Sequence, residues 1–174
     1  RSLSSAASDV YKRQSQVIDL ALKAQKIIIT AESCTGGLVA KSLTDIPGSS
    51  SAFSHGIITY SDNAKMMILD VKKTLLEKHG AVSEQVASMM AKSALNENIS
   101  YVSTAITGIA GPTGACNNKP IGTVWFAWGY YKENQIVIDT QHNYFDGDRA
   151  KIRFESTLMA LTGLEKRLKK LQSG

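Results

Sequence analysis

Hydrophobic residues along the chain follow helical and strand spacings in turn. Val17, Leu20, Ala21 and Ala24 fall at i, i+3, i+4 and i+7, which predicts a helix from residue 15. The β-branched run at 27–30 is typical of a strand buried on both faces, and small residues at 32–37 then lead into a helix at 38–43. The same patterns predict further strands at 56–60, 102–106, 122–128 and 135–139 or beyond, and further helices at 63–69, 71–78, 84–95 and from 148 onward.

The order of these elements predicts the fold class. Helices and strands alternate at first, two strands then form a hairpin around residues 132–134, and a helix closes the chain. Alternation favours parallel strands covered by helices, whereas a hairpin adds antiparallel strands to the same sheet. The sequence therefore predicts an α/β protein, a single three-layer α/β/α domain with a mixed sheet.

The first fourteen residues differ in character from the rest. They are polar, and the stretch DVYKRQ at 9–14 resembles a translated adapter sequence fused to a reading frame. We therefore expect residues 1–14 to be a non-native, poorly packed leader and the domain to span residues 15–174. The polarity of this segment also argues against a signal peptide.

The net charge is modest once this leader is set aside. The chain of 174 residues carries +5, and without Arg1, Lys12, Arg13 and Asp9 the value is +3. So small an excess argues against nucleic acid as a partner. The sequence contains no run of about 20 mostly apolar residues, so we expect no membrane span.

Cysteine and histidine usage limits the disulfides and metal sites that the chain can form. Cys34 and Cys116 are too few for a disulfide scaffold or a four-cysteine zinc site, which favours a reducing, cytoplasmic location. The three histidines, His55, His79 and His142, lack metal-ligand spacing. We therefore expect neither a metal site nor a cofactor.

Two segments of small residues and glycine directly follow predicted strands. Residues 32–37 connect a strand to a helix, where backbone amides can hold an anion or an oxyanion and Ser33 presents a hydroxyl. Residues 107–114 follow another strand, and glycine there lets the backbone approach a ligand. The ends of neighbouring parallel strands meet at one crevice, so the two segments together predict one shared site. On spacing alone, a tight turn without chemistry is the alternative for each.

Other residues have side chains suited to proton transfer or anion binding. Tyr60 and Lys65 follow a predicted strand and can move protons if their pKa values are lowered, although a lysine here is more often a solvated surface residue. Arg149 stands in the first turn of the last helix, where it can fork onto a phosphate or simply lie on the surface. Cys34 competes with Ser33 as a nucleophile, although a buried packing cysteine is the commoner case.

Six segments of the chain together resemble the CinA C-terminal domain family. They are TAESCTGG (30–37), GIITYSDNAK (56–65), HGAVSE (79–84), GIAGP (108–112), KPIGTV (119–124) and GDR (147–149). These segments occur in order, and the resemblance covers the chain from about residue 15 to the C-terminus. The sequence lacks the long N-terminal domain of full-length members, so we expect the stand-alone form of the family.

The resemblance implies an amidase that converts nicotinamide mononucleotide to nicotinic acid mononucleotide and ammonia in pyridine nucleotide salvage. It implies that Ser33 is the nucleophile, Lys65 the general base and Tyr60 a proton-relaying or orienting hydroxyl. A lysine can act as a base near neutral pH only if its pKa falls well below the ordinary value. For substrate binding, through oxyanion or phosphate contacts, we expect Thr35, Gly36, Gly37, Thr107, Gly108 and Arg149.

The segment at 60–65 departs from the family pattern. Members commonly read Y-S-N-E-x-K, whereas this chain reads YSDNAK, so the acidic residue moves by one position. Because Tyr60 and Lys65 are retained, we expect an effect on substrate affinity rather than on the reaction. Two other functions stay open, a nucleotide-binding module without turnover and a competence-associated accessory protein. Assembly into a homo-oligomer is also compatible with the sequence.

Overall fold

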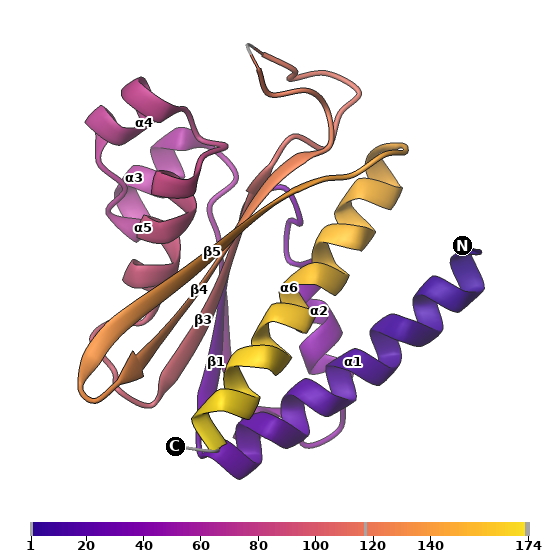
Figure 1. Cartoon of the computed structure of the whole chain (residues 1–174), viewed down its shortest axis with the longest axis vertical. Helices are drawn as coiled ribbons and strands as arrows, with labels where there is room; N and C mark the ends of the chain where they lie inside the picture. The colour runs from indigo at the N-terminus through magenta and orange to yellow at the C-terminus, as the bar shows by residue number, and fades with distance from the viewer. Residues whose placement is uncertain (1, 117, 173–174) are drawn as a thin grey trace.

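The computed structural model describes residues 2–116 and 118–172, and it shows helices on both sides of one sheet (Figure 1). Along the chain the elements are α1 (Leu3–Ala24), β1 (Ile27–Glu32), α2 (Leu38–Thr44), the 3-10 helix η1 (Ser49–Ser51), β2 (Phe53–Ile58), α3 (Asp62–Leu69), α4 (Lys73–His79), α5 (Glu84–Ala94), β3 (Tyr101–Gly108), β4 (Thr123–Lys132), β5 (Gln135–Tyr144) and α6 (Arg149–Gln172). The predicted elements are all present, with β2 beginning three residues earlier than the pattern indicated.

The sheet is mixed, with strand order β2-β1-β3-β4-β5. β1 lies in the middle of the parallel part and pairs with β2 on one side and β3 on the other. β3, β4 and β5 then pair in antiparallel fashion, and the β4–β5 hairpin has the predicted turn. The carboxyl ends of β1 and β3 are therefore neighbours at the same edge of the sheet.

Each face of the sheet is covered by its own group of helices. α1, α2 and α6 lie on one face and α3, α4 and α5 on the other (Figure 1). Side chains alternate between the two faces along a strand, so Ile28 and Phe126 belong to the first core while Ile29 and Ala127 belong to the second. This arrangement confirms the predicted three-layer α/β/α fold with a mixed sheet.

Helix α1 begins at Leu3, well before the predicted start at residue 15. Ala6 and Val10 are buried, and Arg13 forms an ion pair with Glu165 of α6. The expectation that residues 1–14 pack poorly is therefore wrong for this part of the segment. The physical reason is that Ala6 and Val10 continue, at helical spacing, the apolar stripe that carries Val17. The non-native origin of the segment stays a prediction.

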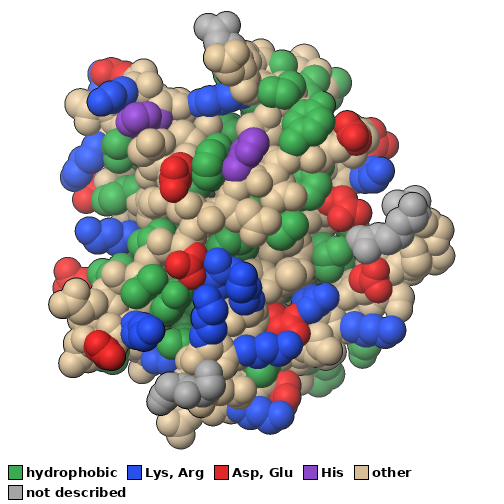
Figure 2. All heavy atoms as spheres, in the orientation of Figure 1, with side chains coloured by type: hydrophobic (Ala, Val, Ile, Leu, Met, Phe, Trp, Pro, Cys, Tyr) green, Lys and Arg blue, Asp and Glu red, His purple; other side chains and the backbone are tan. Residues whose placement is uncertain are grey.

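The surface over α1 and α6 carries both signs of charge. Figure 2 shows blue Lys and Arg side chains gathered on this face with red acidic side chains among them. Ion pairs join Lys169 to Glu165 and Lys23 to Asp19, each one helical turn apart. Helix charges on this face are thus interspersed rather than of a single sign.

Candidate active site

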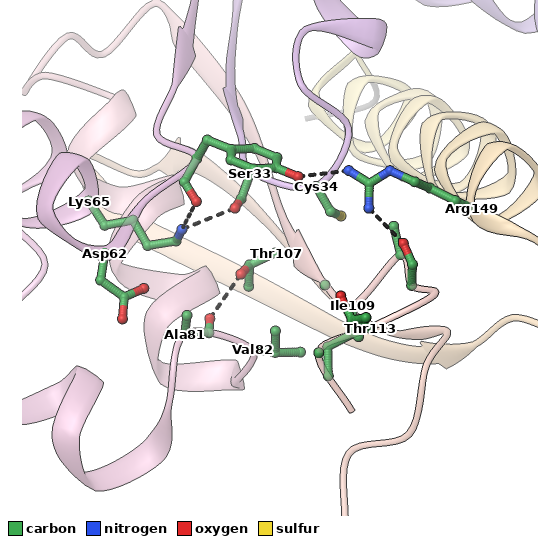
Figure 3. Close-up of a pocket in the computed structure, with 15 residues that line it drawn as sticks. Ser33, Cys34, Asp62, Lys65, Ala81, Val82, Thr107, Ile109, Thr113 and Arg149 are labelled. Atoms are coloured by element: carbon green, nitrogen blue, oxygen red, sulfur yellow. Dashed lines mark hydrogen bonds between the residues drawn. The ribbon is translucent and has the colours of Figure 1, made fainter. Parts of the chain in front are cut away.

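A pocket opens at the edge of the sheet where β1 and β3 end. Its walls come from the turn after β1, the segment between β2 and α3, the loop after β3 and the first turn of α6 (Figure 3). The lining includes the predicted site residues Ser33, Tyr60, Lys65, Thr107, Gly108 and Arg149. Residues far apart in the sequence are therefore gathered around one cavity.

Lys65 reaches Ser33 because of how α3 starts. The hydroxyl of Ser61 accepts a hydrogen bond from the Ala64 amide at 3.1 Å and so caps the helix. Lys65 then lies one turn into α3 with its side chain only 1% exposed. Its amine donates to Ser33 Oγ at 3.0 Å and to the Thr59 carbonyl oxygen at 2.9 Å. The predicted nucleophile and base are in hydrogen-bond contact.

Burial changes the protonation of Lys65. Removal from water disfavours the charged amine and lowers the pKa of Lys65 below its ordinary value, while the negative charge of Asp62 partly opposes this effect. An ammonium group has no lone pair to accept a proton, whereas a neutral amine does. The lowered pKa therefore makes the form that can act as a base available at lower pH.

Cys34 also borders the pocket, but its environment differs from that of Ser33. The side chain is buried, and burial raises the pKa of the Cys34 thiol to about 12. A cysteine attacks as the thiolate, so a raised pKa makes it a poor nucleophile at neutral pH. Of the two neighbours, it is Ser33 whose Oγ accepts a hydrogen bond from the Lys65 amine, at 3.0 Å.

Glu32, the last residue of β1, organises the turn that presents Ser33. Its carboxylate is fully buried and accepts hydrogen bonds from the Thr35 hydroxyl at 2.8 Å and from the Gly37 amide at 3.1 Å. It also accepts from the amides of Val39 and Ala40, both at 3.0 Å, in the first turn of α2. An internal carboxylate thus occupies the helix N-terminus where an external anion was expected.

The substrate-binding role expected of Thr35, Gly36 and Gly37 stays a prediction. Thr35, Gly36 and Gly37 do not line the pocket. The Thr35 hydroxyl and the Gly37 amide are engaged by Glu32, and the Gly36 amide donates to the Ser33 carbonyl oxygen at 3.0 Å. The Thr35 hydroxyl and the Gly36 and Gly37 amides therefore each have an acceptor within the turn.

Tyr60 and Arg149, which both line the pocket, are joined by a hydrogen bond. An Arg149 guanidinium nitrogen donates to the Tyr60 hydroxyl at 2.7 Å, and the other terminal nitrogen donates to the Gly111 carbonyl oxygen at 2.8 Å (Figure 3). Tyr60 is 59% exposed, and its own carbonyl oxygen lies 3.5 Å from the Lys65 amine. Arg149 therefore links the segment after β2 to the loop after β3.

The end of β3 and the loop after it line the pocket. Thr107 is buried and its hydroxyl donates to the Ala81 carbonyl oxygen at 2.9 Å. At Gly108 an added Cβ would lie 2.8 Å from Val124 and 3.1 Å from the Cys34 sulfur, so only glycine fits this approach. The amides of Ala110 and Gly111 donate to no residue in the part of the chain that the structure describes.

Sequence patterns did not identify two residues that hold the turn after β1 in place. Glu32 carries a usable signal, because an acidic residue just before a helix N-terminus can cap that helix. Arg153 donates to the carbonyl oxygens of Cys34 at 3.0 Å and Thr35 at 3.2 Å. Its spacing of four from Arg149 places both arginines on one side of α6, but nothing local in the sequence reveals what they contact.

The described residues also bear on metal and membrane binding. Across residues 2–116 and 118–172, no three His, Cys, Asp or Glu side chains come together in a way that could hold a metal ion. None of the helices described there is both long and apolar enough to cross a membrane.

The fold and pocket define an α/β protein with a serine hydroxyl hydrogen-bonded to a buried lysine. Residues 10–168 match the family model of the CinA C-terminal domain, and the chain belongs to this family. The match starts inside the segment that was expected to be a leader. Among solved structures, a CinA superfamily protein from Klebsiella pneumoniae is 32% identical with a TM-score of 0.85, covering 92% of this chain and 98% of that one.

Two curated relatives differ in length. The Escherichia coli K12 protein named nicotinamide-nucleotide amidohydrolase PncC is 45% identical over 151 residues, which are 86% of this chain and 90% of that protein. A CinA-like protein of Geotalea uraniireducens is 50% identical over 143 residues, 82% of this chain. This chain spans only about a third of that second relative, since the match covers 33% of its length.

Proposed function

We propose that this chain is an amidohydrolase that acts on nicotinamide nucleotides. Its substrate would be nicotinamide mononucleotide, and its products nicotinic acid mononucleotide and ammonia. The observation that carries the proposal is the 3.0 Å contact between Ser33 Oγ and the buried Lys65 amine in a pocket. The 45% identity to the Escherichia coli protein of that name supports the choice of substrate class.

In the first half of the reaction, Ser33 forms a covalent bond to the substrate. The neutral Lys65 amine accepts the Ser33 proton as Oγ attacks the carboxamide carbon. The tetrahedral intermediate then collapses, the carbon–nitrogen bond breaks, and the nitrogen leaves as ammonia with the proton returned from Lys65. The result is an ester between the nicotinate carbonyl and Ser33.

In the second half, water replaces the serine. Lys65 accepts a proton from water, the hydroxide attacks the ester carbonyl, and Ser33 leaves and recovers a proton. Tyr60 assists in this scheme: its hydroxyl oxygen accepts from Arg149, so its O–H remains available to donate to the leaving nitrogen or to water. Tyr60 therefore acts as a proton relay in the proposed reaction.

The loop after β3 is our candidate for binding the charged intermediate. The amides of Ala110 and Gly111 have no acceptor among the described residues, and both residues line the pocket with Thr107 and Gly108. Free amides in a site sheltered from water stabilise a developing oxyanion. Arg149, which donates to the Gly111 carbonyl oxygen of this loop, is our candidate for the 5′-phosphate because a guanidinium forks onto phosphate oxygens.

Ammonia release from nicotinamide mononucleotide by the purified chain tests the proposal. We expect stoichiometric ammonia and nicotinic acid mononucleotide, unchanged by EDTA, since Ser33 and Lys65 need no metal. Binding of the nucleotide without ammonia would instead support a silent nucleotide-binding module. Salt-dependent retention on DNA would support the accessory role.

We also place the activity in the cytoplasm, where the thiols of Cys34 and Cys116 would stay reduced.

A further inference from the structure

We propose that Asp62 makes this pocket selective for a substrate whose carboxamide ring is positively charged, and that it orients such a substrate against Arg149. The inference rests on the proposed function and deepens it. It assigns to this chain a specificity-determining residue for N-ribosyl pyridinium carboxamides with a phosphate at the far end.

The charges around the pocket are arranged along one direction. Among the described residues that line it, Asp62 carries the one carboxylate, while Lys65 and Arg149 are the basic residues. Figure 3 shows Asp62 and Arg149 on opposite sides of Ser33, with Asp62 next to Lys65. With Lys65 neutral, as the reaction requires, the pocket has a negative end and a positive end with the nucleophile between them.

The proposed substrate has the complementary arrangement. In nicotinamide mononucleotide the pyridinium nitrogen is positive and the 5′-phosphate is negative, with the ribose as a spacer. When the phosphate lies at Arg149, the cationic ring and its carboxamide are directed toward Ser33 and Asp62. The opposite orientation would place the phosphate beside Asp62, and like charges at such a separation repel.

The position of the carboxylate within α3 decides whether it can face a cationic ring in the pocket. Asp62 is the first residue of the helix and borders the pocket. The side-chain nitrogen Nδ2 of Asn63 instead donates to the Met67 sulfur at 3.2 Å, and Asn63 does not line the pocket. Successive helical residues point about 100° apart, so moving the acid by one position changes the face that it occupies. The acidic residue of this chain is on the pocket side.

Asp62 also acts on Lys65, which gives a second measurable effect. The titratable groups that act on the Lys65 amine are Asp62 from α3 and Cys34 from the turn after β1. Ser33 Oγ accepts its hydrogen bond, the Tyr60 carbonyl oxygen lies 3.5 Å from it, and Arg149 also lines the pocket. Of these, the carboxylate stabilises the protonated amine and raises the pKa of Lys65 against the effect of burial. Removing the negative charge should therefore release the proton from Lys65 at lower pH.

The decisive experiment compares two ligands that differ in ring charge. The ligands are nicotinamide mononucleotide and benzamide mononucleotide, which has the same carboxamide and ribose phosphate but an uncharged ring. Dissociation constants are measured by calorimetry in the Ser33→Ala background, where no turnover occurs. We expect Asp62→Asn to weaken the cationic ligand about 5- to 10-fold and leave the neutral one nearly unchanged, as for one charge pair near a protein surface.

Two control variants separate charge from helix stability. Asp62→Glu keeps the carboxylate and should preserve the preference for the cationic ligand. Asp70→Asn removes the same charge from the other end of α3, outside the pocket, and should leave both dissociation constants unchanged. In the protein with Ser33 intact, Asp62→Asn should also move the acidic limb of the kcat/KM profile to lower pH.

The outcomes distinguish this inference from the proposed function. Equal weakening of both ligands by Asp62→Asn, an unchanged preference, or binding of neither ligand would overturn the role of Asp62. If the preference depends on Asp62 but the chain with Ser33 intact releases no ammonia, the role of Asp62 stands as a binding role. In that case only the proposed reaction fails.

Discussion

The turn after β1 and the loop after β3 look alike in sequence but differ in what they offer a ligand. Both are rich in small residues and glycine, and both follow neighbouring parallel strands. In the first turn, Glu32 accepts hydrogen bonds from the helix N-terminus, and Ser33 is the residue that the turn places in contact with Lys65. In the second loop, residues 107–111 line the pocket, and the amides of Ala110 and Gly111 are unpaired among the described residues.

Helix α6 holds both segments through two arginines one turn apart. Arg153 donates to the carbonyl oxygens of Cys34 and Thr35 in the first turn, and Arg149 donates to the carbonyl oxygen of Gly111 in the second loop. The difference teaches that a glycine-rich turn at a helix N-terminus is an anion site only if the protein supplies no anion of its own. The first turn places Ser33 against Lys65, and the second loop lines the pocket with amides that have no acceptor among the described residues.

The largest effect should come from removing the nucleophile. Ser33→Ala should reduce kcat by more than about 10³-fold, because no other group in the turn can form the ester. Cys34→Ala should keep most of the activity, and iodoacetamide should not inactivate the enzyme, since the thiol is buried and protonated. Activity of Ser33→Ala that is lost on alkylation would transfer the chemistry to Cys34.

Lys65→Arg should be nearly as inactive as Lys65→Ala, with a loss on the order of 10²–10⁴-fold. A guanidinium stays protonated at any working pH and cannot accept the serine proton. In the unaltered protein kcat/KM should rise with pH as Lys65 loses its proton, with a midpoint below that of an ordinary lysine because burial lowers the pKa of Lys65. An active Lys65→Arg enzyme would contradict the general-base role.

Arg149→Ala tests the binding role of the second loop. Loss of a charge-assisted hydrogen bond should weaken nicotinamide mononucleotide by about 1.5–3 kcal/mol, roughly 10- to 150-fold, while free nicotinamide is affected much less. Tyr60→Phe should have a smaller effect, since it removes the acceptor of one Arg149 hydrogen bond and leaves the Gly111 contact. If Arg149→Ala weakens both ligands equally, the phosphate binds elsewhere.

Glu32→Gln tests whether the first turn depends on its internal carboxylate. The substitution places an amide NH₂ against a backbone amide that now donates to Glu32, so we expect a loss of about 1–3 kcal/mol in stability. For a domain of this size, each kcal/mol lowers Tm by about 2–4 °C. Turnover should fall as well, because Ser33 is the next residue. Glu77→Gln, on the exposed surface, is the matched control and should change neither quantity.

The smallest effect on activity should come from deleting residues 1–14, which do not line the pocket. We expect Tm to fall by several degrees, because Ala6 and Val10 are buried and burying one valine side chain stabilises by about 1.5–3 kcal/mol. Differential scanning calorimetry measures this directly. An unchanged Tm would show that the helix is complete without the segment and would favour the leader hypothesis.

Much of the architecture follows from local patterns in the sequence. The β-branched run that becomes β1, the Ser83 cap of α5 and the β4–β5 hairpin are each determined by residues close together along the chain. Periodicity and caps act over one or two turns, so short windows contain the required information. The resemblance to the CinA C-terminal domain family likewise rested on short segments, and the family match confirms it.

The assignment of polar groups to one another was decided only by tertiary structure. The sequence signals that Glu32 can cap a helix, but it could not reveal which four donors the carboxylate accepts from, or that Arg149 and Arg153 reach two different loops. Nor could it show that Lys65 is buried against Ser33, 32 residues away in the chain. A local pattern records which donors and acceptors exist, whereas their partners depend on which strand ends the fold brings together, and burial then sets their charge states.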